Sequence, residues 1–143
     1  MSGALRPGRA YTGAMAAPDR PATVVVADDD DLVRAVLRMA LSSMSLTVRE
    51  AADSRALATA VDDGAVDLTI LDISIPGPGR AANIALVRKA APHARILILS
   101  GDAEVPANEA PLIDDFARKP IDLDELRDRV ARLLPTIQTD EIS

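Results

Sequence analysis

The sequence predicts an α/β fold in which helices cover both faces of a five-stranded parallel sheet. From residue 23 onward, short aliphatic runs alternate with segments whose apolar residues recur at the helical spacing, a pattern typical of repeated βα units. Tyr11 and Phe116 are the only aromatic residues, so the core must consist of Ala, Val, Ile and Leu. That composition suits parallel strands buried under helices. At 143 residues, one domain with its own core is expected.

Two strands and one long helix are predicted for residues 23–51. The short runs at 23–27 and 47–51 predict the strands. Asp30 or Asp31 can cap the helix between them, because a carboxylate accepts hydrogen bonds from the first free N–H groups. Six apolar residues recur at the helical spacing and predict one inward-facing stripe: Val33, Val36, Leu37, Ala40, Leu41 and Met44.

The middle of the chain predicts two further units of the same kind. A helix over residues 54–63 turns Leu57 and Val61 inward and ends at Gly64, and a strand follows at residues 67–72. After a loop with two Pro-Gly pairs, a helix over residues 81–91 ends before a proline. Its inward residues are Ile84, Val87 and Ala91. The unbroken aliphatic run within residues 95–100 predicts a strand in the centre of the sheet.

The last connection differs from the others. Residues 101–113 contain Pro106 and Pro111 and few apolar side chains, so at most one or two helical turns are expected there. A short strand at 114–118 and a final helix follow, the helix capped by Asp122 and ended by a proline. The apolar face of this helix comprises Leu123, Leu126, Val130, Leu133 and Leu134. The total is five strands and five connections, with the fourth helix short or irregular.

The ends of the chain lack the periodicity of the rest. Residues 1–21 are rich in Gly, Pro, Ala and Arg, and we expect them to form a flexible leader. Residues 136–143 are expected to form a polar tail. The folded domain is therefore expected over residues 22–135.

The composition excludes several classes of function. A formal net charge of -6 and a pI near 4.7 argue against binding to nucleic acid or to an anionic membrane, both of which need clustered Lys and Arg. No apolar run reaches transmembrane length, and the N-terminus lacks the apolar core of a signal peptide. Without cysteine there is no disulfide or thiolate metal site, which suits the reducing cytoplasm.

Polar residues that can carry chemistry follow four of the predicted strands. Asp28 and Asp29 follow the first strand, Asp72 ends the third, Ser100 ends the fourth and Lys119 follows the fifth. In an open parallel sheet the carboxyl ends of the strands meet at one edge, where reactive groups gather. We therefore expect these five side chains to converge on one crevice.

Phosphoryl transfer is the chemistry that this set favours. Three carboxylates held about 4 Å apart would repel by about 4 kcal/mol per pair at an effective dielectric of about 20, and a cation relieves that repulsion. Only hard oxygen ligands are present, which favours Mg²⁺ over zinc. Asp72 can act as the nucleophile and form an acyl phosphate. Lys119 supplies a positive charge, and Ser100 a hydroxyl donor, for the phosphoryl oxygens.

Four motifs resemble the receiver domain of two-component response regulators. They are VVVADDD at residues 24–30, LDISIPG at 71–77, LSG at 99–101 and RKP at 118–120. The resemblance extends over residues 23–134 and implies a flavodoxin-like doubly wound fold, (βα)5, with strand order 2-1-3-4-5.

The resemblance also implies roles for individual residues. Asp72 is the implied phosphoacceptor. Asp29 and Asp72 are implied to bind Mg²⁺ directly, Asp28 through water and Ser74 through its main-chain carbonyl. The family switch places Ser100 and Phe116 in moving roles. Because Phe116 cannot donate a hydrogen bond as the commoner Tyr does, any signal through it is expected to come from packing alone.

Each motif has a simpler explanation when taken alone. The run from Asp28 to Asp31 could be an ordinary acidic helix start, Ser100 part of a turn and Lys119 a strand exit. Their occurrence in order at successive strand ends favours a site. Two alternatives remain: a receiver-like adaptor that binds partners independently of phosphorylation, and an aspartate-dependent phosphohydrolase. The latter would normally have an acid two residues after its nucleophile, where Ser74 stands.

The function we expect is that of a stand-alone cytoplasmic receiver. It would accept a phosphoryl group on Asp72 from a sensor histidine kinase or a histidine phosphotransfer protein, using Mg²⁺. Its signal would pass to a downstream protein by contact or by onward phosphotransfer, unless the chain is a piece of a longer protein. We expect a monomer or a weak phosphorylation-dependent dimer. Rather than an enzyme, it would be a phosphoacceptor that assists its own phosphorylation and dephosphorylation.

Overall fold

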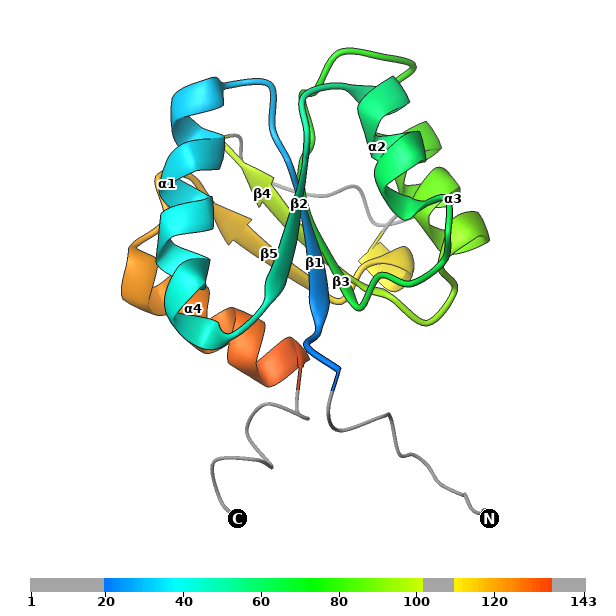
Figure 1. The fold of residues 1–143 in the computed structure, drawn as a ribbon. Coiled ribbons are helices and arrows are strands. Elements are labelled where there is room, and N and C mark those ends of the chain that lie inside the picture. Colours follow the sequence, from blue (N-terminus) through cyan, green and yellow to red (C-terminus); the bar gives the residue numbers. More distant parts are fainter. Residues whose placement is uncertain (1–19, 102–109, 135–143) are drawn as a thin grey trace, which may run out of the picture.

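A computed structural model describes residues 20–101 and 110–134. In these residues a five-stranded parallel sheet has the order β2-β1-β3-β4-β5, with α1 and α4 on one face and α2 and α3 on the other (Figure 1). The strands are β1 (Thr23–Ala27), β2 (Thr47–Ala51), β3 (Leu68–Asp72), β4 (Arg95–Ser100) and β5 (Asp115–Arg118). The helices are α1 (Asp31–Leu41), α2 (Ser54–Val61), α3 (Arg80–Ala90) and α4 (Leu123–Leu133), with 3-10 turns η1 (Ser42–Met44) and η2 (Ala110–Leu112). The predicted fold class and strand order are confirmed.

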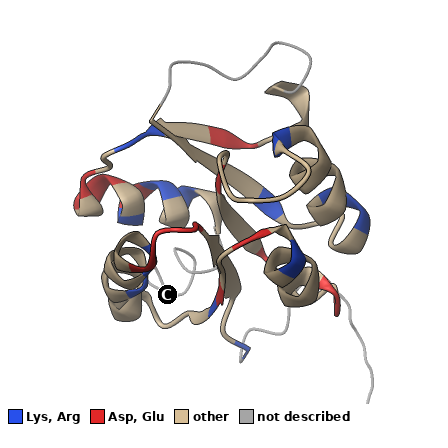
Figure 2. Ribbon diagram, turned by 90° about the horizontal axis from the view of Figure 1, so that it is seen from above, with Lys and Arg blue, Asp and Glu red and all other residues tan. Residues whose placement is uncertain are grey.

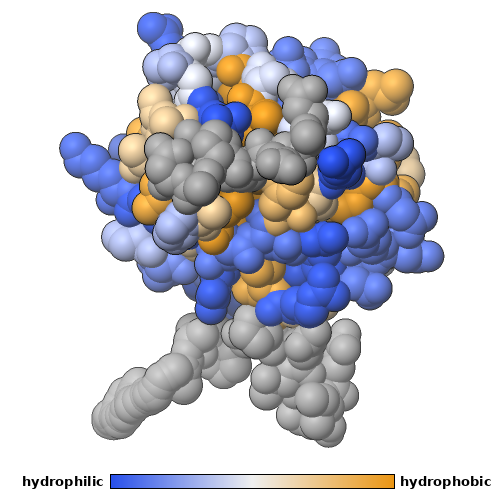
Figure 3. Space-filling view, turned by 180° about the vertical axis from the view of Figure 1, so that it is seen from behind, coloured by the Kyte–Doolittle hydropathy of each residue, from blue (hydrophilic) through white to orange (hydrophobic). Residues whose placement is uncertain are grey.

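The sheet separates two layers of aliphatic core. Side chains alternate between the faces of a strand, so Val25 and Leu71 pack with α2 and α3, whereas Val24 and Ile70 pack with α1 and α4. Strands β1 and β3 are buried along their whole length. Burial on both faces explains why these strands are continuous apolar runs in the sequence. Seen from behind, the hydrophobic surface is divided into small areas among hydrophilic residues (Figure 3).

Aspartate side chains begin three of the four described helices. Asp30 caps α1 by accepting hydrogen bonds from the N–H groups of Leu32 and Val33, which decides between the two predicted caps. Asp53 caps α2 and Asp122 caps α4 in the same way. These short polar side chains satisfy N–H groups that have no partner within the helix. The helix starts are therefore encoded locally.

The predicted inward stripe of α1 is wrong at one residue. Leu37, Ala40 and Leu41 are buried, but Val36 is 38% exposed. At about 100° per residue, Val36 lies at the margin of the stripe, beside the exposed Leu32. Six apolar residues make a stripe wider than the sheet can cover, so its margin faces outward.

Some predicted boundaries differ from the observed ones by one or two residues. Helix α2 ends at Val61 rather than at residue 63, because the chain turns into the left-handed conformation of Gly64, whose N–H group donates to Val61 O. Strands β3 and β5 each begin one residue later than predicted, and α3 is shifted by one residue toward the N-terminus. Strand β4 lies inside the sheet, between β3 and β5.

Several predictions fall outside the described residues. The leader at 1–21 and the tail at 136–143 lie almost wholly or wholly there, as do residues 102–109 of the connection between β4 and β5. The described end of that connection contains only η2. None of the helices in residues 20–101 and 110–134 is long and apolar enough to cross a membrane.

Candidate functional site

The register of the sheet brings the predicted site residues to one edge. Ala27 pairs with Leu71, so Asp28 and Asp72 leave neighbouring strands at the same level. On the other side of β3, Asp72 pairs with Leu99, the residue before Ser100. Figure 2, seen from above, shows the acidic segment that enters α1 as a continuous red stretch at this edge. Parallel pairing thus gathers side chains that lie far apart in the sequence.

Three carboxylates form a compact acidic cluster. Asp28, Asp29 and Asp72 each place a carboxylate oxygen within 4.8 Å of the others. Asp28 and Asp72 are buried, whereas Asp29 is exposed to solvent. The predicted convergence of these three residues is confirmed.

Lys119 lies against the two buried carboxylates. Its ammonium nitrogen is 2.7 Å from Asp28 Oδ2 and 3.5 Å from Asp72 Oδ2. Burial alone would lower the pKa of Lys119, but the hydrogen bond to Asp28 and the charges of Asp72 and Asp28 outweigh it and raise the pKa above its ordinary value. Lys119 is therefore a permanent cation at neutral pH.

The hydroxyl of Ser74 contacts Asp72, a contact that the sequence prediction missed. Ser74 Oγ lies 3.2 Å from both carboxylate oxygens of Asp72, and its N–H group donates to Asp72 Oδ1 at 3.3 Å. The resemblance implied a role only for the carbonyl of Ser74. A serine two residues after an aspartate commonly closes such a local turn, and that spacing was the available signal.

The two predicted switch residues occupy different environments. Ser100 is buried at the end of β4, and its carbonyl accepts a hydrogen bond from the N–H group of Lys119 at 2.8 Å. Phe116, on the edge strand β5, is half-buried and packs against the core layer of α2 and α3. The structure therefore places Ser100 beside Lys119 and Phe116 within the core packing.

The donor set fits a hard divalent cation. Three carboxylates within 4.8 Å offer only oxygen ligands, the type that Mg²⁺ prefers. Lys119 offsets part of the negative charge, and its bond to Asp28 leaves that carboxylate less free to coordinate an ion directly.

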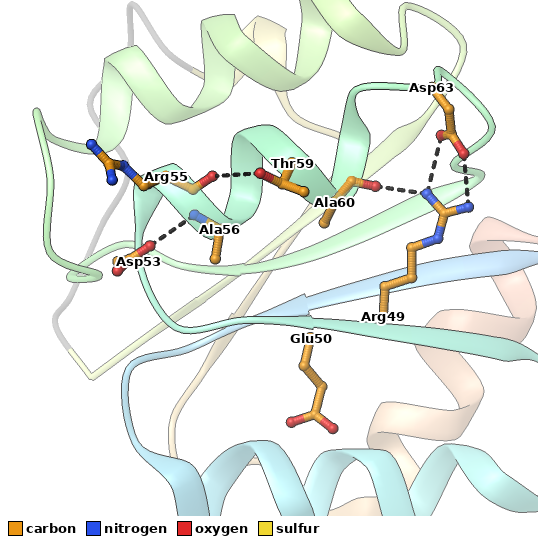
Figure 4. A pocket seen from close by; sticks show the side chains of 8 residues that line it. All are labelled: Arg49, Glu50, Asp53, Arg55, Ala56, Thr59, Ala60 and Asp63. Carbon is orange, nitrogen blue, oxygen red and sulfur yellow. Dashed lines mark hydrogen bonds and ion pairs between the residues drawn. The ribbon is translucent and has the colours of Figure 1, made fainter.

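A pocket beside the sheet lies apart from this set of residues. It is formed between β2 and α2, and its lining includes none of the acidic cluster and not Lys119 (Figure 4). Arg49 crosses it and bonds to both carboxylate oxygens of Asp63 and to Ala60 O. Because the charges of Arg49 and Asp63 pair with each other, the Arg49 guanidinium is not available to bind a ligand in this pocket.

The fold and the acidic edge together define a class of protein: an α/β signalling domain whose strand-end carboxylates fit aspartyl phosphorylation. The model of the response regulator receiver domain matches residues 24–131. The chain belongs to the response regulator receiver family.

Similar curated proteins are longer than this chain. It is 35% identical over 117 residues to the DNA-binding transcriptional regulator NtrC of Azospirillum brasilense, covering 79% of this chain and 24% of NtrC. It is 33% identical over 113 residues to the transcriptional regulatory protein TcrA of Mycobacterium tuberculosis, covering 77% of this chain and 45% of TcrA. The chain thus spans less than half the length of these relatives, 24% of NtrC and 45% of TcrA.

Solved structures show the same fold. The receiver domain of the hybrid histidine kinase CckA is 27% identical, with a TM-score of 0.68 over 78% of this chain and 98% of that one. A CheY-like receiver from Methanospirillum hungatei has a TM-score of 0.74 at 16% identity, over 85% of this chain and 99% of that one. A response regulator from Burkholderia pseudomallei has a TM-score of 0.67 at 20% identity, over 85% of this chain and 71% of that one.

Proposed function

We propose that this chain accepts a phosphoryl group on Asp72 from a phosphohistidine, in a reaction that depends on Mg²⁺. The observation that carries the proposal is the convergence of the three clustered carboxylates with the Lys119 ammonium at the carboxyl edge of the sheet. The similar Burkholderia structure is described with a phosphorylated aspartic acid and a calcium ion, which supports the same chemistry here.

Asp72 is the best placed of the three carboxylates to accept the phosphoryl group. Asp28 is the closer partner of Lys119, whose ammonium lies 2.7 Å from its Oδ2, and its other carboxylate oxygen accepts from the N–H group of Asp30. Asp29 is exposed, and its position outside the buried part of the cluster suits a cation ligand. Asp72 is buried at the end of β3, within 3.5 Å of the Lys119 ammonium. The Lys119 ammonium therefore lies close enough to pair with a phosphoryl group on Asp72.

The transfer exchanges one bond to phosphorus for another. The P–N bond of the phosphohistidine breaks as an O–P bond forms to a carboxylate oxygen of Asp72, and the imidazole leaves with the electron pair. Lys119 stabilises the negative charge on one phosphoryl oxygen, and the Ser100 hydroxyl donates to another. A Mg²⁺ ion held by Asp29 and Asp72, by the carbonyl of Ser74 and through water by Asp28 would neutralise further phosphoryl charge.

The donor and the recipients of the signal follow from this chemistry. A receiver implies a partner kinase, and we propose a sensor histidine kinase or a histidine phosphotransfer protein as the donor. The phosphorylated domain passes its signal by protein contact or by onward phosphotransfer, with Ser100 and Phe116 responding to the phosphoryl group. It acts as a monomer or a weak phosphorylation-dependent dimer in the cytoplasm. Its partners are proteins and not nucleic acid or membranes, in keeping with the formal net charge of -6.

Intact-mass spectrometry after incubation with acetyl phosphate and Mg²⁺ tests the proposal. Wild type should gain the mass of one phosphoryl group, and the gain should disappear in excess EDTA and in Asp72→Asn. Asp62→Asn is the matched control, because Asp62 is an exposed aspartate at the end of α2. It should be modified like wild type.

Two outcomes would contradict the proposal. Folded wild type that stays unmodified with acetyl phosphate and with phosphorylated histidine donors would favour an adaptor. Such an adaptor would bind its partner equally well with Asp72→Asn and with beryllofluoride. Steady turnover of small phosphate esters would instead indicate a phosphohydrolase.

A further inference from the structure

Asp28 is held at each of its polar atoms. Its N–H group donates to Ala51 O at 3.0 Å, and its two carboxylate oxygens accept from Asp30 N at 2.9 Å and from Lys119 Nζ at 2.7 Å. Its carbonyl oxygen accepts from Arg34 Nη1 at 2.7 Å. Of these four partners, only Arg34 is a side chain from outside the candidate site.

Arg34 is itself held from two sides. Its guanidinium donates from Nε to Glu50 Oε1 at 3.1 Å and from Nη2 to Asp31 Oδ1. Glu50 stands on β2 and points away from the Arg49 side of that strand, toward α1 (Figure 4). The hydrogen bond to Asp31 raises the pKa of Arg34 although burial opposes it, and the side chain is only 14% exposed. The guanidinium therefore occupies one fixed position between α1 and the edge strand.

The carbonyl that Arg34 binds belongs to the peptide unit that leads into Asp29. Because the peptide unit is planar, a hydrogen bond to this carbonyl fixes the orientation of the whole unit and with it the Cα of Asp29. No hydrogen bond or ion pair with any residue in the described part of the chain holds the Asp29 carboxylate itself. The peptide unit that Arg34 holds thus sets the point from which the Asp29 side chain leaves the backbone.

We propose that Arg34 is a positioning residue for the cation site, which orients Asp28 and Asp29 toward Asp72 without touching the ion. Glu50 orients Arg34 in turn, so the edge strand β2 supports the site through two side chains. This inference rests on the proposed function, because it assigns Arg34 a part in the same Mg²⁺-dependent reaction.

The direction of the change in Mg²⁺ affinity distinguishes a positioning role of Arg34 from the effect of its charge. A positive charge near the cluster repels a cation, so removing the charge of Arg34 would by itself tighten Mg²⁺ binding. Loss of the support that a neighbouring residue gives to metal ligands typically weakens binding by about tenfold or more. Weaker binding after removal of Arg34 therefore reports lost orientation.

Arg38 provides a matched control. It lies one turn further along α1 and donates to the other carboxylate oxygen of Glu50, but it is 59% exposed and bonds to no residue of the site. Its replacement removes one positive charge and one Glu50 contact from the same helix face. It leaves the bond from Arg34 to the Asp28 carbonyl in place.

Magnesium titration followed by the backbone amide NMR signals of Asp29 and Asp30 tests the inference. Arg34→Gln should weaken Mg²⁺ binding about tenfold, and Arg34→Lys should also weaken it, because an ammonium keeps the charge but cannot span three acceptors. Arg38→Gln should stay within about twofold of wild type. In acetyl phosphate assays, Arg34→Gln should need more Mg²⁺ for half-maximal rate and approach the wild-type rate at saturation. A merely structural role would not produce this split.

Equal Mg²⁺ affinities of Arg34→Gln, Arg38→Gln and wild type would overturn the inference. So would a wild-type affinity of Arg34→Lys, because it would show that Mg²⁺ binding does not need the guanidinium that spans three acceptors. If Arg34→Gln does not fold, Arg34→Lys decides the question. Failure of the proposed function has a different signature: wild type itself would stay unphosphorylated, whatever the affinities of the variants.

Discussion

The ammonium of Lys119 bonds to the carboxylate of Asp28 at 2.7 Å, across 91 positions of sequence. Because Asp28 is buried, this bond supplies the cation that its carboxylate needs in the absence of water. The same ammonium is 3.5 Å from Asp72. Lys119 therefore lies within ion-pair distance of both Asp28 and the proposed phosphoacceptor Asp72.

Replacement of Lys119 by Met should slow phosphorylation by about a hundredfold, because a charged donor to the transferring group is lost. The rate is measured by intact mass against time with acetyl phosphate at saturating Mg²⁺. Lys89→Met, at an exposed lysine of α3, is the control and should react like wild type. Equal rates for the two variants would show that Lys119 takes no part in the phosphorylation reaction.

Magnesium should stabilise the folded domain, because the three carboxylates converge only after folding. At ten times the dissociation constant, the gain is about 1.4 kcal/mol if the unfolded chain does not bind the ion. Thermal denaturation with MgCl2, against NaCl of the same ionic strength, measures it. Asp29→Asn should reduce the shift in melting temperature. Identical melting in both salts would argue against a cation site.

A hydrogen bond between the partly buried Ser54 and the buried Asn83 joins α2 to α3. Ser54 Oγ donates to Asn83 Oδ1 at 2.6 Å, whereas Asn83 Nδ2 has no hydrogen-bond partner among the described residues. A Cβ atom at Gly77 would lie 2.1 Å from Ser54 Oγ, so the loop after β3 packs closely against this pair. The bond therefore links both helices to the segment that follows Asp72.

Ser54→Ala should lower the free energy of unfolding by about 1–3 kcal/mol, because the buried Asn83 amide oxygen loses the hydrogen bond from Ser54. The double variant Ser54→Ala/Asn83→Leu should recover most of that loss, since it leaves no polar group unsatisfied. Urea denaturation of the two single variants and the double variant completes the cycle. Additive losses would show that the two side chains do not interact.

Side chains satisfy the backbone of Phe116 on the outer edge of the sheet. Its N–H group donates to Asp115 Oδ1 at 2.8 Å, and its carbonyl accepts from Arg129 Nη1 at 3.3 Å. Arg129 and Asp115 also form an ion pair at 2.7 Å. Together they take the place of a neighbouring strand at this residue.

Arg129→Gln should therefore speed hydrogen exchange at the Phe116 amide by several-fold, while the amide of Ile98 in β4 changes little. Hydrogen exchange measured by NMR tests this. Arg132→Gln on the last turn of α4 is the control, because none of the described hydrogen bonds of Phe116 involves Arg132. Unchanged exchange at Phe116 would mean that the ion pair does not protect the edge.

Asp114 should contribute to stability against acid. Burial opposes its charge, but hydrogen bonds from Ile96 N and Arg88 lower its pKa below the ordinary value of 3.8. A carboxyl with a lowered pKa stabilises the fold above its unfolded-state value. That contribution is lost progressively as the pH falls from about 3.8 to the folded-state pKa.

Urea midpoints measured between about pH 6 and pH 3 should therefore fall less steeply at the acid end for Asp114→Asn than for wild type. At neutral pH the variant should be the less stable protein, because the charge-assisted bond from Arg88 is weakened. Asp62→Asn should keep the wild-type slope. Parallel curves for wild type and Asp114→Asn would contradict the prediction.

The sequence by itself determined the helices, the strands and the residues of the acidic cluster. Helix starts follow from local chemistry, as at Asp30, and strands such as β1 and β3 are buried on both faces, which leaves continuous aliphatic runs. The convergence of Asp28, Asp29 and Asp72 was predictable because parallel strands end at a common edge.

Only the tertiary structure decided which contacts those residues make. The exposure of Val36 depends on how much of α1 the sheet can cover. Lys119 lies closer to Asp28, at 2.7 Å, than to Asp72, at 3.5 Å, and this difference depends on how the three strands are placed in space. The hydrogen bond from Arg34 to the Asp28 carbonyl depends on Glu50, which lies on strand β2. Such contacts join residues far apart in the chain, and local sequence patterns carry no information about them.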